Sequence, residues 1–185
     1  MSFFLRLQPW ALFLLTFVLP FGVMMGGSMA LILLQLQLPI FFAIYSCVML
    51  LMLGSLFGWL WALGAYLTRL LPAGTVASVR WLHTALTIPG LYILLILAVL
   101  PRGFSTTGSS FQPAWALAIV PLHLLSMACI FYSLYYVARA LRSVELQRQA
   151  QFSECVGEFF LLWFYPVGIW FIQPRINQLA DRTVS

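Results

Sequence analysis

Charged residues are scarce in this chain: aspartate, glutamate, lysine and arginine together make up 7% of its 185 residues. Lysine is absent, all nine basic residues are arginine, and the formal net charge is +5. Hydrophobic residues reach 63%, which is far more than a soluble core of this size encloses. The scarcity of charge therefore excludes an ordinary soluble domain and predicts an integral membrane protein whose solvent is the lipid bilayer.

Motifs for metal, redox and enzyme chemistry are also missing. Cys47, Cys129 and Cys155 show no CxxC spacing, so we expect no disulfide framework, metal site or cofactor. The sequence contains no HExxH, GxSxG, P-loop or Gly-rich dinucleotide motif, so it predicts no catalytic residues. Because the arginines flank apolar segments as membrane anchors do, the positive charge calls for no nucleic-acid partner.

Long apolar runs make up most of the chain. Four segments, at residues 9–34, 40–67, 81–100 and 114–137, each supply roughly the 20 residues that a helix needs to cross a bilayer. The first could instead be a cleaved signal peptide, but its apolar run continues through Leu34, which favours a retained helix. The fold class we predict is an all-α polytopic membrane protein with four transmembrane helices. Residues 1–138 would form the bundle, 139–155 a cytoplasmic helical extension, and 156–185 a further membrane segment and tail.

The arginines predict an orientation. If the N-terminus is cytoplasmic, Arg69, Arg80 and the arginines after the fourth span fall on the cytoplasmic side, as the positive-inside rule requires. If the last apolar segment crosses, six arginines lie inside and three outside; if it turns back, eight lie inside and one outside. The distribution favours a segment that turns back.

The length of the last apolar segment supports the same choice. Residues 159–172 would reach only about 21 Å as a helix, short of a hydrocarbon core of about 30 Å. Pro166 and Gly168 make the sequence YPVG a natural turning point. We therefore predict a re-entrant hairpin in which Glu158 and Arg175 return to the same interface and pair. The alternative is a short, proline-kinked fifth span over residues 155–173.

The ending FLLWFYPVGIWFIQPRINQL resembles the C-terminal signature of a group of uncharacterised small bacterial integral membrane proteins that share a final W-x-x-Q-P-R-x-N motif. The resemblance covers about twenty residues and implies a family but no activity. Its matching positions are Trp170, Gln173, Pro174, Arg175 and Asn177. Their chemistry suits an interfacial anchor, in which the two amides bind free carbonyls and Arg175 binds lipid phosphate or Glu158.

Other polar side chains have simpler readings. For His123 we expect a buried imidazole hydrogen-bonded across helices, rather than a haem ligand or proton carrier. For Glu145, Glu154 and Glu158 we expect a solvated helix, with Ser153 as N-cap of the last segment and Glu154 near its positive end. A catalytic pair at Glu154 and Glu158 is the weaker alternative, although their spacing places both on one helix face.

Small residues recur every four positions in the first two spans and predict close helix contacts. Internal packing is the default, with a second copy or another protein left open as the partner. We expect four tryptophans to be lipid-facing or interfacial anchors: Trp59, Trp61, Trp163 and Trp170. The packing positions are Gly22, Gly26, Ala30, Gly54, Gly58 and Ala62.

These features favour a non-enzymatic accessory or scaffold protein of the bacterial inner membrane, packing against itself or within a larger complex. The alternative is a small transporter or channel for a neutral or lipidic solute, which a water-accessible track past Tyr92 and His123 would support. No span carries Asp, Glu, Lys or Arg, which weakens the case for an ion-coupled transporter. A membrane enzyme acting on lipid ranks third.

Overall fold

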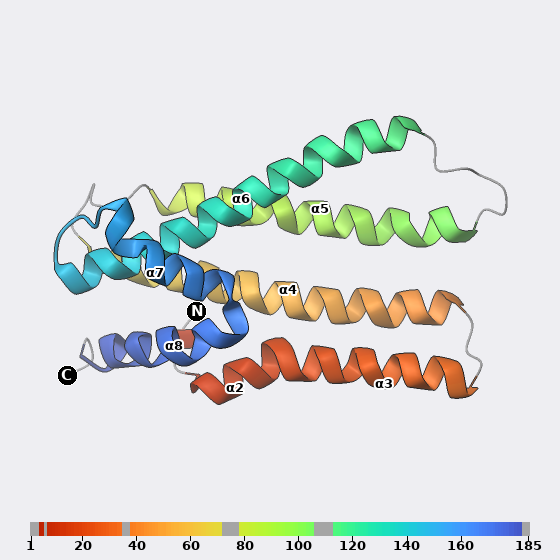
Figure 1. Cartoon of the computed structure of the whole chain (residues 1–185), viewed down its shortest axis with the longest axis horizontal. Coiled ribbons are helices and arrows are strands. Elements are labelled where there is room, and N and C mark those ends of the chain that lie inside the picture. The colour runs from red at the N-terminus through yellow and green to blue at the C-terminus, as the bar shows by residue number, and fades with distance from the viewer. Residues whose placement is uncertain (1–3, 6, 35–37, 72–77, 106–112, 183–185) are drawn as a thin grey trace.

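The computed structural model describes residues 4, 5, 7–34, 38–71, 78–105 and 113–182, and these residues form helices and short turns without any strand (Figure 1). Four helices are long and apolar enough to cross a membrane, over Pro9–Leu34, Pro39–Arg69, Val79–Val99 and Leu117–Leu146. The predicted all-α polytopic fold with four spans is therefore confirmed. Arg6 and most of the three predicted breaks between the spans lie outside the described residues.

A wider turn interrupts the first span. Helix α2 (Pro9–Phe13) begins with a proline at its first position, where no intrahelical donor is needed. The π-helical turn η1 (Leu14–Val18) follows and leads into α3 (Leu19–Leu34). In a regular α-helix the ring of Pro20 would clash with the carbonyl of Thr16, four residues earlier, and the wider π turn relieves that clash.

The next three helices are long. Helix α4 (Leu38–Arg69) packs between α3 and α5 (Val79–Ser105), and α5 packs against α6 (Pro113–Leu146). With 34 residues α6 is about 51 Å long, so it extends well beyond a hydrocarbon core of about 30 Å. The polar sequence after the fourth span therefore continues the same helix as far as Leu146.

The C-terminal segment is a helical hairpin. Helix α7 (Phe152–Trp163) packs against α6, and α8 (Tyr165–Arg182) packs against α7 and α2. The turn between α7 and α8 lies near the middle of the molecule's long axis, and α8 runs back toward the end from which α7 starts (Figure 1). This path matches the predicted hairpin and differs from a fifth span, which would continue to the opposite end.

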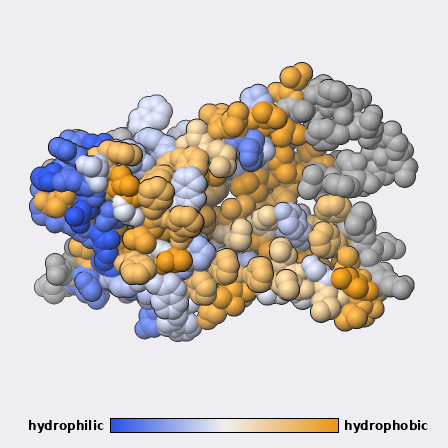
Figure 2. All heavy atoms as spheres, viewed as in Figure 1, coloured by the Kyte–Doolittle hydropathy of each residue, from blue (hydrophilic) through white to orange (hydrophobic). Residues whose placement is uncertain are grey.

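The core lies in the half of the molecule that holds the hairpin. Its fully buried residues include Trp59, Leu141 and Ile172, from α4, α6 and α8. In the other half Leu33 of α3 and Leu117 of α6 are 72% and 78% exposed. Hydrophilic residues gather at the hairpin end, and the other coloured part of this face is largely hydrophobic (Figure 2). The bundle is thus closed by α7 and α8 at one end, whereas its apolar faces are open to the surrounding membrane at the other.

Candidate functional site

The C-terminal motif lies on α8, where its polar residues point in two directions. Ile169, Ile172 and Ile176 of α8 are fully buried and hold one face of the helix against the core. Pro174 lies inside α8 and removes one backbone donor, so the helix has a weak point in the middle of the motif. Gln173 and Asn177 contact the N-terminal segment, whereas Arg175 contacts α6 and α7.

We call the first group the polar lock; it comprises Trp59, Gln173, Asn177 and the carbonyls of Phe4 and Leu7. Trp59 Nε1 donates to Gln173 Oε1 at 2.8 Å, and both side chains are fully buried. Gln173 Nε2, which carries two hydrogens, lies within hydrogen-bond distance of three acceptors: the Phe4 carbonyl at 2.9 Å, the Leu7 carbonyl at 3.0 Å and Asn177 Oδ1 at 3.2 Å. Asn177 Nδ2 adds a 3.3 Å bond to Leu7. The polar lock joins the N-terminal segment, α4 and α8.

We call the second group the ion-pair network; it comprises Arg142, Glu145, Glu158 and Arg175. Arg175 binds Glu145 through two bonds, from Nε at 2.7 Å and from Nη2 at 2.5 Å. The same Nη2 donates to Glu158 Oε1 at 3.0 Å, so the pair that the hairpin prediction required is present. Arg142 binds Glu145 at 3.1 Å. Two arginines and two carboxylates give the network a formal charge of zero, and it joins α6, α7 and α8.

Hydrogen bonds with two side chains of α6 fix the turn between α6 and α7. Arg139 Nε donates to the Ala150 carbonyl at 3.1 Å, and the Ala150 N–H donates to Ser143 Oγ at 3.0 Å. Between Ser143 and Ala150 the chain reverses direction through Gln147, whose φ of 53° lies in the left-handed region. Both backbone groups of Ala150 are therefore satisfied by α6, which sets the direction in which α7 leaves.

The start of α7 differs from the prediction. Gln151, not Ser153, is the N-cap residue, and its N–H donates to Glu154 Oε2 at 2.8 Å. Glu154 also pairs with Arg148, whose guanidinium lowers the pKa of this carboxyl. Glu154 does lie in the first turn, as expected, where the helix dipole favours a negative charge.

The turn between α7 and α8 depends on a close approach of two backbones. Phe164 is the C-cap of α7, and Pro166 follows in the first turn of α8, close to the predicted YPVG turning point. A Cβ on Gly168 would lie 1.7 Å from the carbonyl oxygen of Leu161, far inside van der Waals contact. Gly168 is therefore required because α8 passes directly over the backbone of α7.

Tryptophan placement corrects part of the sequence prediction. Trp163 and Trp170 are 46% and 49% exposed, and Trp170 contacts Phe13 with ring centroids 5.9 Å apart. Trp61 stacks on His83 at 3.8 Å. Trp59 is fully buried, so its prediction as a lipid-facing or interfacial anchor is wrong. The indole N–H is the cause, because in the core it has the carboxamide of Gln173 as a partner.

Glu145 is a second position that sequence reasoning missed. Its side chain is 24% exposed and binds arginines on α6 and α8, so it is not simply part of a solvated helix surface. The signal available in the sequence was the spacing of Glu145 three residues after Arg142, which predicts a pair on one helix face. The partner on α8 comes 30 residues later, and no local pattern identifies it.

His123 lies apart from both groups, on the half of α6 that is far from the hairpin. Its Nδ1 is 3.1 Å from Tyr92 Oη of α5, so the expected bond across helices is present. The imidazole is exposed rather than buried, which corrects the other part of that prediction. The reason is that the hairpin packs against the other half of α6 and does not extend to this depth (Figure 1).

The small-residue stripes also need correction. Among the described residues nothing lies within 4 Å of a Cβ on Gly22, Gly26 or Gly54, so the expectation of internal packing is wrong for these three. Gly58 faces the ring of Phe4, Ala62 is buried, and Ala30 is half-buried. Close contacts instead occur at two other glycines of the same helices. A Cβ on Gly27 would lie 3.0 Å from Ile44, and a Cβ on Gly64 would lie 2.0 Å from Leu82.

The carboxylates of Glu154 and Glu158 have separate arginine partners, Arg148 and Arg175, and do not form a shared site. Among the described residues no group of three or more His, Cys, Asp or Glu comes together as a metal site would require. The three cysteines are free thiols. The polar lock and the ion-pair network thus hold the hairpin against the rest of the chain, and residues of the C-terminal motif make most of these contacts.

Comparisons with protein-family models, with curated proteins and with solved structures found no match to this chain.

Proposed function

We propose that this chain is a non-enzymatic accessory or scaffold protein of a bacterial inner membrane, which acts by associating with other membrane proteins. The observation that supports this proposal best is the use of the C-terminal motif within the chain itself. Gln173 is fully buried with both ends of its carboxamide hydrogen-bonded, and Arg175 is occupied by two carboxylates. A motif engaged in this way stabilises a shape and leaves little capacity for a substrate.

The shape offers surfaces for association. Lipid-facing residues of α3 and α6 form long apolar faces, and among the described residues the main contacts of α3 are with the rest of the first span and with α4. In a bilayer, replacing lipid with protein on such a face costs little free energy, and close packing at small residues favours the helix–helix contact. Gly22 and Gly26 lie exposed on α3, where a partner helix could approach closely.

The arginine distribution supports a cytoplasmic N-terminus in this proposal. Arg69 ends α4 and Arg80 begins α5 at the hairpin end, and the ion-pair network lies at the same end (Figure 1). Under the positive-inside rule this end faces the cytoplasm. The hairpin would then enter the membrane from the cytoplasmic side and return to it.

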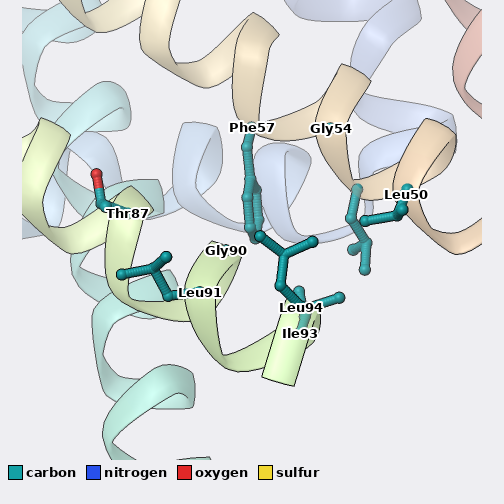
Figure 3. A pocket seen from close by; sticks show the side chains of 9 residues that line it. Leu50, Gly54, Phe57, Thr87, Gly90, Leu91, Ile93 and Leu94 are labelled. Carbon is teal, nitrogen blue, oxygen red and sulfur yellow. The ribbon is translucent and has the colours of Figure 1, made fainter. Parts of the chain in front are cut away.

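A second candidate function, transport or binding of a neutral or lipidic solute, has one observation in its favour. An apolar groove of about 290 Å³ lies between α4 and α5, next to Gly54 and Gly90 (Figure 3). Neither glycine has a described atom within 4 Å of its Cβ position, so the groove has room for an acyl or isoprenoid chain. The remaining lining residues are Leu50, Leu53, Phe57, Thr87, Leu91, Ile93 and Leu94.

Native mass spectrometry of the protein, extracted gently from its own membrane, separates these candidates. Stoichiometric protein partners support the accessory function. A protein that carries only a defined lipid or solute supports the second candidate. If that species disappears in Gly54→Leu, which fills the groove, but persists in the matched surface variant Gly22→Leu, the groove is its binding site.

A further inference from the structure

We infer that the chain forms a two-fold symmetric dimer in the membrane through the face around Tyr92 and His123. The starting point is the position of this pair. Along α6, His123 is about 15 Å from Pro113 and about 24 Å from Arg139, so it lies about 5 Å from the midpoint of this segment and well inside a hydrocarbon core of about 30 Å. His123 is nonetheless exposed, and its neighbours Val120 and Leu124 are 55% and 63% exposed.

At this depth an exposed imidazole needs a partner. Tyr92 occupies Nδ1, and the described residues supply no hydrogen-bond partner to the other ring nitrogen, Nε2. Water is absent from the bilayer centre, and an unpaired polar group there costs several kcal/mol. The ester carbonyls and headgroups of lipids lie at the interface, roughly half the core thickness away. The partner must therefore be a polar group of a membrane-embedded protein.

The pair is complementary to itself. If Tyr92 donates to Nδ1, the imidazole keeps a donor at Nε2–H and the phenol oxygen keeps acceptor capacity. If Nδ1–H donates to Tyr92, the roles exchange, and Nε2 is the acceptor while the hydroxyl is the donor. In both tautomers the pair offers one donor and one acceptor. A second copy supplies the opposite set, so Nε2 of each His123 bonds Tyr92 Oη of the other chain.

Membrane topology makes this match possible. Copies of one membrane protein share one orientation, so a two-fold axis that relates them must be perpendicular to the membrane. Such an axis keeps each residue at its own depth. Tyr92 Oη and His123 Nδ1 are only 3.1 Å apart. The Tyr92 hydroxyl of one copy therefore lies at nearly the same depth as the His123 imidazole of the other copy. Their exposed apolar neighbours would complete the interface: Leu95, Leu117, Val120 and Leu124. This inference goes beyond the proposed function, since it concerns only the chain's contact with itself.

Cross-linking of the purified protein in liposomes tests the position of the interface. In a background with Cys47, Cys129 and Cys155 changed to alanine, Leu124→Cys places one thiol beside His123. Met25→Cys on α3 is the matched control, because Met25 is 57% exposed. A short bifunctional maleimide should link Leu124→Cys into covalent dimers and leave Met25→Cys monomeric. Equal cross-linking of the two variants, or none, overturns the inference.

Energy transfer between two labelled populations in the same liposomes tests the polar pair. His123→Leu should weaken self-association about tenfold, since two interhelical hydrogen bonds are lost. Tyr92→Phe keeps the shape of the ring and should weaken association to a similar extent. If both variants are folded and still associate in liposomes as tightly as the unmodified chain, the inference is overturned. An absence of association in the unmodified protein also overturns it.

Discussion

At the residue scale, the carboxamide of Gln173 connects three parts of the chain while shielded from both water and lipid. Gln173→Ala removes the acceptor of Trp59 Nε1 and the donor to two carbonyls. We expect a loss of about 3 kcal/mol of folding free energy, because buried polar groups without partners cost about 1–3 kcal/mol each. Denaturation in detergent micelles, followed by tryptophan fluorescence, measures it. The control is Gln178→Ala on the exposed side of α8, where the change should stay within about 0.5 kcal/mol.

Arg175 tests whether geometry or charge alone matters in the ion-pair network. Arg175→Lys keeps the positive charge but cannot make the two bonds that Nε and Nη2 make to Glu145. We expect a loss of about 1–2 kcal/mol of folding free energy in the same denaturation assay. Arg148→Lys is the control, because that side chain is 55% exposed and solvent screens its pair with Glu154, so this substitution should have a much smaller effect. Equal effects of the two substitutions would contradict a specific role for Arg175.

At the element scale, the hairpin depends on how closely α8 approaches α7. Gly168→Ala places a methyl group 1.7 Å from the Leu161 carbonyl, so the two helices must separate. We expect more than about 3 kcal/mol of destabilisation, or failure to accumulate, since no side chain can move aside to relieve this clash. Gly157→Ala within α7 has open space at its Cβ and should stabilise the protein by up to about 1 kcal/mol. Thermal denaturation of both variants in one detergent gives the comparison, and a mild effect at Gly168 would show that α8 does not lie over α7.

The elements were predictable to different degrees for physical reasons. The spans follow from hydropathy, because a bilayer demands about 20 apolar residues per crossing. The hairpin follows from a segment too short to cross and from the number of arginines on each side. Helix faces could not be predicted as well. Gly26 and Gly27 are adjacent in sequence, yet only Gly27 lies against α4, and a single helical step of rotation decides between them.

Apart from the Glu158–Arg175 pair, the side-chain partners of the polar lock and the ion-pair network could not be predicted from the sequence. Trp59 sits in an apolar run where burial and lipid exposure suit an indole equally well, and its partner lies 114 residues away. The C-terminal motif did indicate that Gln173 and Arg175 matter, because polar residues near a membrane segment require partners. It gave no means of choosing between lipid phosphate, Glu145 and Glu158 for the guanidinium.

At the scale of the whole molecule, the hairpin determines on which side of the membrane the chain ends. Because α8 returns to the end where α7 begins, the last residue should lie on the same side as Arg69 and Arg80 (Figure 1). A fifth crossing would place it on the opposite side. We therefore expect a fluorescent reporter fused after Ser185 to mature in the cytoplasm, and an exported phosphatase at the same position to stay inactive.

Two controls make this topology experiment decisive. A reporter fused to a chain truncated after Gly108, between α5 and α6, should give the opposite pattern. The phosphatase should then be active, because an odd number of spans precedes it. Fusion after Gln149, between α6 and α7, should match the pattern at Ser185, because the hairpin adds no crossing. An active phosphatase at Ser185 together with an inactive one at Gln149 would show that α7 and α8 cross the bilayer. In that case Arg175 would have to reach Glu145 and Glu158 from a different arrangement of helices than the one in which all three now meet.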